Sequence, residues 1–317
     1  MKVTEHIKKS NGTLFSFELL PPLKGHNFEE INSAIEPLLE FSPAYVNVTY
    51  HQQEIIYKKH KSGLLEKKTI RKRPGTVGIA AAIKFNYNVD VVPHIICGGF
   101  NMEETENALI DLHFLGINNL FVVRGDPEKS QKYFIPETDG HSHSIDLVKQ
   151  IINTNKGIYL DDELQNTTAT DFCVGVAGYP EKHIEAPNIM SDLTFLKQKI
   201  DAGAEYIVTQ MFFDNQKYFN FVKLCHENGI NCPIIPGIKP IATIDQVYNL
   251  PKTFNIDIPE ALVKEVLKAK DNKQAREVGV EWTTEQAKEL KQHGAPALHF
   301  YTMGKSDNIK KIVESVF

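Results

Sequence analysis

The sequence predicts an α/β protein that folds as a (β/α)8 TIM barrel. Eight short runs rich in β-branched and aromatic residues alternate with longer amphipathic stretches along the chain. The runs are almost continuously apolar, which is typical of parallel strands that are buried on both faces of a sheet. Eight parallel strands joined by right-handed helical crossovers close naturally into a barrel. We therefore expect residues 1–317 to form a single catalytic barrel domain.

The eight expected strands are distributed over the whole chain. They cover residues 14–19, 44–50, 91–97, 119–125, 172–178, 205–213, 232–238 and 296–302. An open doubly wound sheet is the alternative for this pattern. It is weakened because the first strand is not followed by G-x-G-x-x-G, the mark of a dinucleotide-binding sheet. The glycine-containing stretch 75–82 has no strand at the required spacing and is predicted to begin a helix.

Apolar residues at helical spacing predict helices between these strands. The helices are expected over residues 28–41, 103–115, 191–202, 215–228 and 305–316. Ser191 and Asp192 are expected to cap the helix that they begin. Several helices are followed by a glycine, as expected for a left-handed residue just after a helix: Gly116, Gly203, Gly229 and Gly294.

Three segments exceed the simple repeat of strand and helix. Residues 51–74 are polar and basic and are predicted to form a long loop after the second strand. Residues 156–170 are predicted to be an insertion before the fifth strand. Residues 251–293 are predicted to hold additional helices before the last strand.

The composition is that of an ordinary globular protein, with 42% hydrophobic and 24% charged residues. The net charge of −5 argues against a general nucleic-acid-binding protein, which would carry an excess of basic residues. The N-terminal residues lack the apolar core of a signal peptide, and no run reaches the roughly 20 apolar residues of a membrane span. We therefore expect a cytoplasmic protein that binds neither nucleic acid nor membranes.

The four cysteines form no C-x-x-C pair and lie in or beside apolar runs: Cys97, Cys173, Cys225 and Cys232. Buried free thiols in a reducing compartment are expected, with a catalytic cysteine as the weaker alternative. His141 and His143 have no third ligand at a fixed spacing, so no metal site is predicted. A basic run is predicted to be a solvated loop, with a phosphate contact as the alternative: Lys67, Lys68, Arg71, Lys72 and Arg73.

Polar residues near the C-terminal ends of the strands are the candidates for the active site, because barrel enzymes place their catalytic groups there. They are Glu18, Thr49, His94, Arg124, Gly125, Asp126, Tyr179, Glu181, His183 and Gln210. All of these side chains are expected to converge on one mouth.

Glu18 is the leading candidate. It follows Phe17 near the end of the first strand, and apolar surroundings should raise its pKa into the range of a general acid. The alternative is an exposed strand position without a catalytic role. His94 could equally be a hydrogen-bonded core histidine. Thr49 and Gln210, taken singly, favour structural roles.

The sequence Arg124-Gly125-Asp126 has two interpretations. It could be a simple turn that is closed by a salt bridge. A glycine between a cation and an anion also lets the backbone approach a planar ligand or a phosphate. The second interpretation is preferred, because the tripeptide ends the fourth expected strand.

Several motifs resemble those of the 5,10-methylenetetrahydrofolate reductases. They are SFELLPP at 16–22, VNVTY at 46–50, PHIIC at 93–97, VVRGD at 122–126, GYPEKHIEA at 178–186, LKQKIDAGAEYIVTQMFFD at 196–214, PIIPGIKPI at 233–241 and HFYTMGKSD at 299–307. The motifs fall in order over almost the whole chain. The resemblance is to the short form without the regulatory domain of eukaryotic members, so inhibition by S-adenosylmethionine through such a domain is not expected.

The resemblance implies a barrel enzyme that binds FAD and no metal. A hydride would pass from NADH or NADPH through FAD to methylenetetrahydrofolate, giving methyltetrahydrofolate by a ping-pong mechanism. The product would supply methyl groups for methionine synthesis. Small-molecule substrates and a homo-oligomer are the expected partners. The choice between NADH and NADPH stays open.

The resemblance also implies roles for individual residues. Glu18 matches the acid that protonates N10 of the folate, and Asp126 matches the acid that stabilises the resulting iminium cation. Positions matching folate contacts are Gln210, Gln246 and Lys305. Positions matching FAD contacts are Thr49, His94, Arg124, Gly125, Asp126, His143, Tyr179, His183, Glu185, Asp192 and Lys199. Of these, Arg124 and Lys199 are natural partners for the pyrophosphate.

Some residues depart from the family pattern. His143 stands where many members have a tyrosine, and Phe195 and Gln198 replace polar or basic FAD contacts of some members. Leu250 stands where some members place a phenylalanine that stacks on nicotinamide. Lys305 replaces an arginine and keeps its charge but loses its bidentate fork.

Two other functions fit parts of the pattern. One is a different flavin barrel, such as a proline-dehydrogenase-like oxidase, which an amine would reduce and NAD(P)H would not. The other is a catalytically idle folate- or flavin-binding protein. The presence of both Glu18 and Asp126 disfavours this second alternative, because a simple binding protein needs neither acid.

Overall fold

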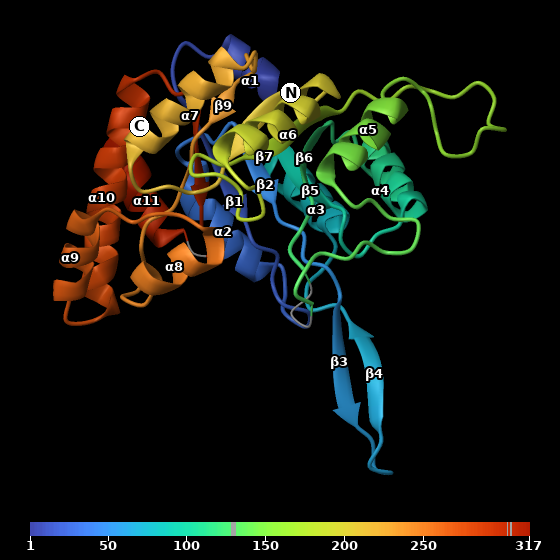
Figure 1. Cartoon of the computed structure of the whole chain (residues 1–317), viewed down its shortest axis with the longest axis horizontal. Coiled ribbons are helices and arrows are strands. Elements are labelled where there is room, and N and C mark those ends of the chain that lie inside the picture. Colours follow the sequence, from blue (N-terminus) through green and yellow to red (C-terminus); the bar gives the residue numbers. More distant parts are fainter. Residues whose placement is uncertain (128–130, 303, 305) are drawn as a thin grey trace.

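The computed structural model describes residues 1–127, 131–302, 304 and 306–317 and shows a parallel barrel surrounded by helices (Figure 1). The barrel strands are β1 (Leu14–Leu19), β2 (Tyr45–Val48), β5 (Val91–Ile96), β6 (Asn119–Val123), β7 (Cys173–Gly178), β8 (Tyr206–Thr209), β9 (Ile234–Ile235), β10 (Gly237–Ile238) and β11 (Ala297–Tyr301). They pair in the order β10-β11-β1-β2-β5-β6-β7-β8-β9. The eight predicted strand regions are confirmed.

The segment that contains β9 and β10 closes the barrel. β9 pairs with β8, whereas β10 pairs with β11 on the other side. Pro236 separates the two halves, and because proline has no N–H it cannot continue the ladder. Its carbonyl instead accepts a hydrogen bond from the amide of His299 at 3.0 Å. The predicted (β/α)8 barrel is therefore confirmed, with the expected strand 232–238 broken at Pro236.

Helices connect the strands and cover the outside of the barrel (Figure 1). They are α1 (Val3–Lys9), α2 (Glu29–Leu39), α3 (Thr76–Tyr87), α4 (Met102–Phe114), α5 (Ser144–Thr154), α6 (Ile189–Asp201), α7 (Asn215–Glu227), α8 (Gln246–Phe254), α9 (Glu260–Lys268), α10 (Asn272–Gln292) and α11 (Asp307–Val316). Every predicted helix is present, and α1 and α5 are additional to those predicted. None of the helices in the described residues is long and apolar enough to span a bilayer.

The expected cap of α6 is wrong. The helix begins at Ile189, and the side chain of Asn188 accepts a hydrogen bond from the amide of Ser191 at 2.9 Å. Asn is among the preferred N-cap residues, so the cap forms upstream of Ser191 and Asp192. The predicted glycines after helices are confirmed, since all have positive φ: Gly116, Gly203, Gly229 and Gly294.

The expected loop over residues 51–74 is largely a β-hairpin. β3 (Glu54–Lys59) and β4 (Leu65–Ile70) pair antiparallel and stand away from the barrel (Figure 1). Ile55, Ile56 and Tyr57 supply the β-branched and aromatic residues that favour a strand. The turn between the strands contains Gly63 with a φ of 86°. The lysines of this segment concealed the strand pattern in the sequence.

The other two long segments differ from each other. Residues 155–172 contain no helix or strand and run between α5 and β7. The segment 251–293 contains the end of α8 and all of α9 and α10, so its predicted helices are present.

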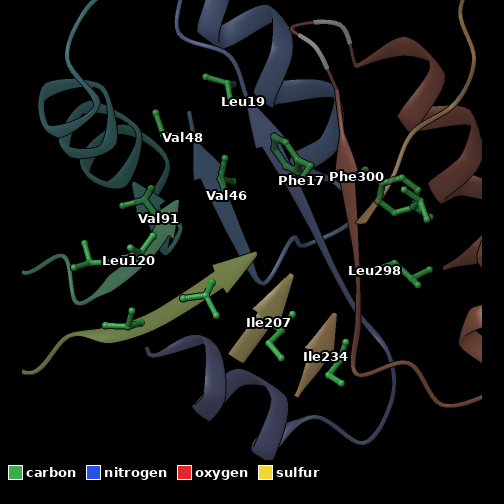
Figure 2. Packing of buried hydrophobic residues seen from close by; sticks show 14 of the residues in the cluster. Phe17, Leu19, Val46, Val48, Val91, Leu120, Ile207, Ile234, Leu298 and Phe300 are labelled. Atoms are coloured by element: carbon green, nitrogen blue, oxygen red, sulfur yellow. The ribbon is translucent and has the colours of Figure 1, made fainter. Parts of the chain in front are cut away.

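The largest apolar cluster lies between the barrel and the helices. Phe17, Val46, Leu120 and Phe300 are among its buried side chains (Figure 2). Each side chain of this size contributes roughly 1.5–3 kcal/mol by its burial. The four cysteines are all free, and three of them are buried in or beside the clusters.

A second apolar cluster fills the interior of the barrel toward the N-terminal ends of the strands. It includes Tyr45, Phe121 and Tyr206. α1 closes this end, because Val3 is fully buried against the cluster and its amide donates to Asn119 Oδ1 at 2.8 Å. The barrel interior is therefore filled with apolar side chains at this end, and the candidate polar residues lie toward its C-terminal end.

Candidate active site

The C-terminal mouth of the barrel receives side chains from alternate positions of the strands. In β11, Leu298 and Phe300 belong to the cluster under the helices, so His299 and Tyr301 face the interior (Figure 2). The same alternation turns Glu18 inward from β1. Glu18 is in register with Tyr301 on one side and with Asn47 on the other.

Among the described residues, no cation pairs with Glu18 to compensate a negative charge. Its side chain is 16% exposed, and burial raises its pKa to about 8. His94 Nε2 lies 3.8 Å from Glu18 Oε2, which is too long for a hydrogen bond. Burial, together with the charges of His299 and His51, lowers the pKa of His94 to about 3, so this imidazole is neutral. Glu18 is therefore mainly an uncharged acid at pH 7.

Buried polar groups continue from Glu18 into the barrel. Asn47 Nδ2 donates to His94 Nε2 at 3.2 Å, which places the proton of the neutral ring on Nδ1. Further down β1, Ser16 Oγ lies 3.0 Å from His299 Nδ1. Selecting polar residues at the C-terminal ends of strands did not identify Asn47 and His299, which are both 1% exposed. Their signal in the sequence is a polar residue within an otherwise apolar strand.

Asp126 lies exposed on the rim of the mouth. The chain turns just before it at Gly125, whose φ of 88° favours glycine. The carbonyl of Arg124 accepts from the amide of Gly98 at 3.2 Å, and Gln52 Nε2 donates to the carbonyl of Asp126 at 3.0 Å. These bonds fix the backbone of Asp126 and leave its carboxylate at the surface of the mouth.

Arg124 forms a bidentate ion pair with Glu185, at 2.6 and 2.8 Å. Its guanidinium also lies over the ring of Phe134, 5.1 Å from the centroid. The hydrogen bonds from Arg124 hold the pKa of Glu185 below its usual range, and nearby His143 adds to this effect. His143 is exposed at the start of α5. The salt bridge of the Arg124-Gly125-Asp126 turn thus goes to Glu185 and not to Asp126.

Tyr179, His183 and Asp192 form one wall of the mouth. The rings of Tyr179 and His183 meet edge to face at 4.8 Å, and the amide of His183 donates to Asp192 Oδ2 at 2.8 Å. Burial raises the pKa of Tyr179, and the charges of Asp192 and Asp126 raise it further. Asp126 and this wall are therefore close enough to interact.

Lys199 provides a cation near this wall. Its Nζ donates to the carbonyl of Ala177 near the end of β7, at 3.0 Å. Burial lowers the pKa of Lys199 to about 8, partly opposed by the charge of Asp192. The amine is still mainly protonated at pH 7.

Thr49 and Gln210 are bound to the backbone of the mouth. Thr49 Oγ1 donates to the carbonyl of Leu19 at 3.4 Å. Gln210 Oε1 accepts from the amide of Met211 at 2.9 Å, and the amide of Gln210 donates to Gly178 at 2.8 Å. Both residues lie where the sequence placed them, at the ends of their strands.

A cavity of about 90 Å³ adjoins the mouth beside Tyr301. Gln246, at the start of α8, lines it and accepts from the amide of Ala242 at 2.7 Å. Lys239, which the strand-end rule missed, lines it as well. Lys239 is 4% exposed, and burial lowers its pKa to about 8. Among the described residues its amine donates a single long bond, of 3.3 Å, to the adjacent Pro240 carbonyl.

Arg276 of α10 adds a second cation to the lining of this cavity. Its Nε is buried and has no hydrogen-bond partner among the described residues. The expected folate contact Lys305 lies outside the described residues. The cavity therefore brings together two cations, Gln246 and the acid Asp307, from α8, α10, α11 and the segment after β10.

The mouth fits a planar ligand that carries phosphates, such as FAD. Lys199 is a buried cation, and the guanidinium of Arg124 can bind a phosphate in a bidentate way once Glu185 is displaced. Gly125 lets the backbone come close to a bound ligand. No group of three or more His, Cys, Asp and Glu side chains suited to a metal ion occurs within the described ranges.

The chain is similar to known proteins in sequence and in fold. A sequence model of the family described as methylenetetrahydrofolate reductase matches residues 2–316. The Arabidopsis thaliana protein named methylenetetrahydrofolate reductase (NADH) 1 is 32% identical over 316 residues, which are 96% of this chain and 48% of that protein. The chain thus spans about half the length of this curated relative.

A bacterial relative matches over most of both lengths. The 5,10-methylenetetrahydrofolate reductase of Escherichia coli K12 is 30% identical over 294 residues, which are 92% of this chain and 86% of that protein. Among solved structures, an uncharacterised Clostridium thermocellum protein that binds two copies of 5-methyl-5,6,7,8-tetrahydrofolic acid matches with a TM-score of 0.55. It is 14% identical and covers 98% of this chain and 97% of its own, so it supports the fold alone.

Proposed function

The chain belongs to the methylenetetrahydrofolate reductase family, and from that premise we propose that it reduces 5,10-methylenetetrahydrofolate to 5-methyltetrahydrofolate with NADH or NADPH. FAD would be the bound cofactor, and the two substrates would react in turn by a ping-pong mechanism. The observation that carries this proposal is Glu18, a buried and uncharged acid at the barrel mouth.

Glu18 would act as the proton donor to the folate. With a pKa of about 8, about nine-tenths of its carboxyl groups are protonated at pH 7. Transfer of this proton to N10 breaks the bond between N10 and the methylene carbon and leaves a cationic iminium at N5. His94 beside Glu18 is neutral and therefore does not stabilise the carboxylate form of Glu18. The protonated form of Glu18 is then the one that contacts the substrate.

Asp126 would stabilise the iminium cation. Its carboxylate is at the surface of the mouth, and its backbone is fixed by Gln52. A fixed anion near a developing positive charge lowers the activation barrier for forming the cation, because the anion does not have to reorient during the reaction. Gln210 would orient the folate ring from the end of β8.

Arg124, Lys199 and Gly125 would hold the pyrophosphate of FAD, with Tyr179 and His183 along the same wall. When bound there, FAD supplies hydride transfer between the nicotinamide and the folate. Arg124 would exchange its bidentate contact with Glu185 for one with the ligand, which keeps its fork geometry. The remaining expected contacts of the cofactor are Thr49, His94, Asp126, His143, Glu185 and Asp192.

The cavity beside Tyr301 would receive the acidic tail of the folate. Lys239 and Arg276 line it with one acid, Asp307, so cations outnumber anions there, and Gln246 lies beside them. A carboxylate would offset the cost of burying both cations. Lys305, which lies outside the described residues, is retained as a proposed folate contact.

We propose a cytoplasmic location, supported by the four free cysteines, which are typical of a reducing compartment. There the product would supply methyl groups for methionine synthesis.

Half-reactions of the purified holoenzyme test the proposal. NAD(P)H should bleach the flavin absorbance anaerobically, and methylenetetrahydrofolate should restore it. Glu18→Gln should slow the second half-reaction by on the order of 100-fold or more and leave the first nearly unchanged, because only the second needs a proton donor. A flavin that an amine reduces and NAD(P)H does not would identify another flavin barrel. Equal losses in both half-reactions would exclude the acid role.

A further inference from the structure

The hairpin of β3 and β4 forms an exposed basic arm, defined as residues 54–73 (Figure 1). Eight lysines and arginines and two glutamates give the arm a net charge of +6. The complete chain carries −5, so the rest of the molecule carries −11. The arm is thus a concentrated positive charge on an acidic protein.

The arm also exposes apolar side chains near its tip. Tyr57, Leu64 and Leu65 are 63%, 72% and 68% exposed. A two-stranded hairpin is only marginally stable without packing against another surface. Its outer edges also present unpaired backbone groups. These features indicate that the arm packs against a partner.

A segment of matching chemistry lies elsewhere in the same chain. The acidic loop, defined as residues 158–164, carries three consecutive acids, Asp161, Asp162 and Glu163, and all three are exposed. Its apolar residues are also exposed: Ile158 by 54%, Leu160 by 41% and Leu164 by 51%. The loop therefore combines exposed apolar residues with the opposite charge to the arm.

The acidic loop is held in place by hydrogen bonds near its base. The amide of Leu160 donates to Glu106 Oε2 at 2.8 Å. Tyr159 donates its hydroxyl proton to the carbonyl of Thr168 at 2.7 Å. The apolar and acidic residues are thus presented on an anchored loop.

The arm and the acidic loop cannot meet within one molecule. The arm follows β2 and so leaves the barrel at the C-terminal ends of the strands, whereas the acidic loop precedes β7 at the N-terminal ends. β5 and β6 also separate β2 from β7 in the sheet. Figure 1 shows the arm on the opposite side of the barrel from the segment beyond α5.

We propose that the arm of one molecule packs against the acidic loop of a second copy of this chain. Two copies that lie side by side in opposite directions make this contact twice and form a closed dimer. Each six-residue strand extends about 20 Å, which lets the arm lie along the partner's barrel. The charge of −11 on the rest of the molecule disfavours a nucleic acid as the occupant and favours an acidic protein surface.

Charge reversal on each side of the contact tests this proposal in the full-length holoenzyme. The arm variant is Lys58→Glu, Lys59→Glu, Lys67→Glu and Lys68→Glu, which takes the arm from +6 to −2. The loop variant is Asp161→Lys with Asp162→Lys, which takes the acidic loop from −3 to +1. Wild type should be a dimer by light scattering at ~50 mM salt and should dissociate toward 1 M, because exposed charges are screened. Each variant alone should raise the dimer Kd by on the order of 100-fold.

Restoration of the dimer separates this contact from a general effect of charge. An equimolar mixture of the two variants should dimerise, since each then meets an opposite charge at both contacts. The variant with all six substitutions should also dimerise. Lys264→Glu, Lys268→Glu, Lys270→Glu and Lys273→Glu make the same charge change at exposed positions on and beside α9 and should leave the dimer intact. Unchanged circular dichroism confirms that each variant is folded.

Several results would overturn the proposal. A monomeric wild type at low salt would do so, as would a loop variant that stays dimeric. Equal dissociation of the α9 control would show that net charge alone is responsible. Arm-dependent retention of a short RNA, with an oligomeric state that ignores the loop variant, would make a nucleic acid the occupant.

Discussion

Replacing Glu18 with glutamine should stabilise the folded protein while it removes the proposed proton donor. The carboxyl group is buried without a compensating cation in the part of the chain that the structure describes. Its pKa of about 8 in the folded protein compares with an ordinary value of 4.5. Between these two pH values the unfolded chain releases a proton that the folded protein retains. The stability of the wild type therefore falls as pH rises through this window, and glutamine has no such loss.

The size of the effect follows from the width of the window. Each pH unit contributes about 1.4 kcal/mol. The glutamine variant should therefore gain little at pH 4, about 3 kcal/mol at pH 7 and about 5 kcal/mol above pH 8, where the wild type is ionised in both states. The neighbouring histidines His94 and His299 contribute equally to both proteins and cancel in the difference.

Urea unfolding at pH 5, 6, 7, 8 and 9 measures this difference directly. The exposed Glu277, changed to glutamine, is the matched control and should give no gain that increases with pH. A difference between wild type and Glu18→Gln that is independent of pH would refute the reasoning. A glutamine variant less stable than wild type at pH 8 would show that Glu18 is ionised and paired in the folded state.

Three further predictions concern His94, Lys239 and Lys199. His94 has a pKa of about 3 and an ordinary value of 6.5, so wild type should lose stability as pH falls between these values. In urea unfolding, the free energy of unfolding of His94→Gln should change less between pH 6 and 4 than that of wild type. Equal changes in the two proteins would contradict this. Lys239→Met should raise the KM for the folate by roughly tenfold with little change in kcat, by loss of a charged contact; an unchanged KM would exclude the contact. Lys199→Met should weaken FAD binding by at least roughly tenfold in a fluorescence titration. The control Lys197→Met, at a partly exposed position of the same helix, should not. Equal affinities of these two variants would remove Lys199 from the site.

The barrel could be predicted from the sequence because its strands are apolar on both faces. Continuous apolar runs such as 91–97 and 172–178 are readily recognised as buried parallel strands. The hairpin was missed because lysines occupy both of its faces and hide the alternation of strand residues. The break at Pro236 follows from the missing N–H of proline, but the pairing of the two halves with different neighbours depends on closure of the whole barrel.

The candidate site could be predicted in its position and only partly in its contacts. Glu18 and Asp126 could be selected from the sequence because they lie at the C-terminal ends of barrel strands, and these ends meet at one mouth. It could not show that Arg124 pairs with Glu185, since that contact depends on the path of the loop after β7. Lys239 directly follows the expected strand 232–238 and could have been selected in the same way, but its burial beside the cavity depends on the other segments that line it.

The pairing of β1 with β11 has a consequence for synthesis of the chain. Glu18 and its register partner Tyr301 are separated by 283 positions, so one edge of β1 has no neighbour until almost the entire protein has left the ribosome. Helices and the strand pairs from β1 to β9 can assemble earlier, as an open sheet with two free edges. The site around Glu18 is therefore completed last, when the final strand enters the gap.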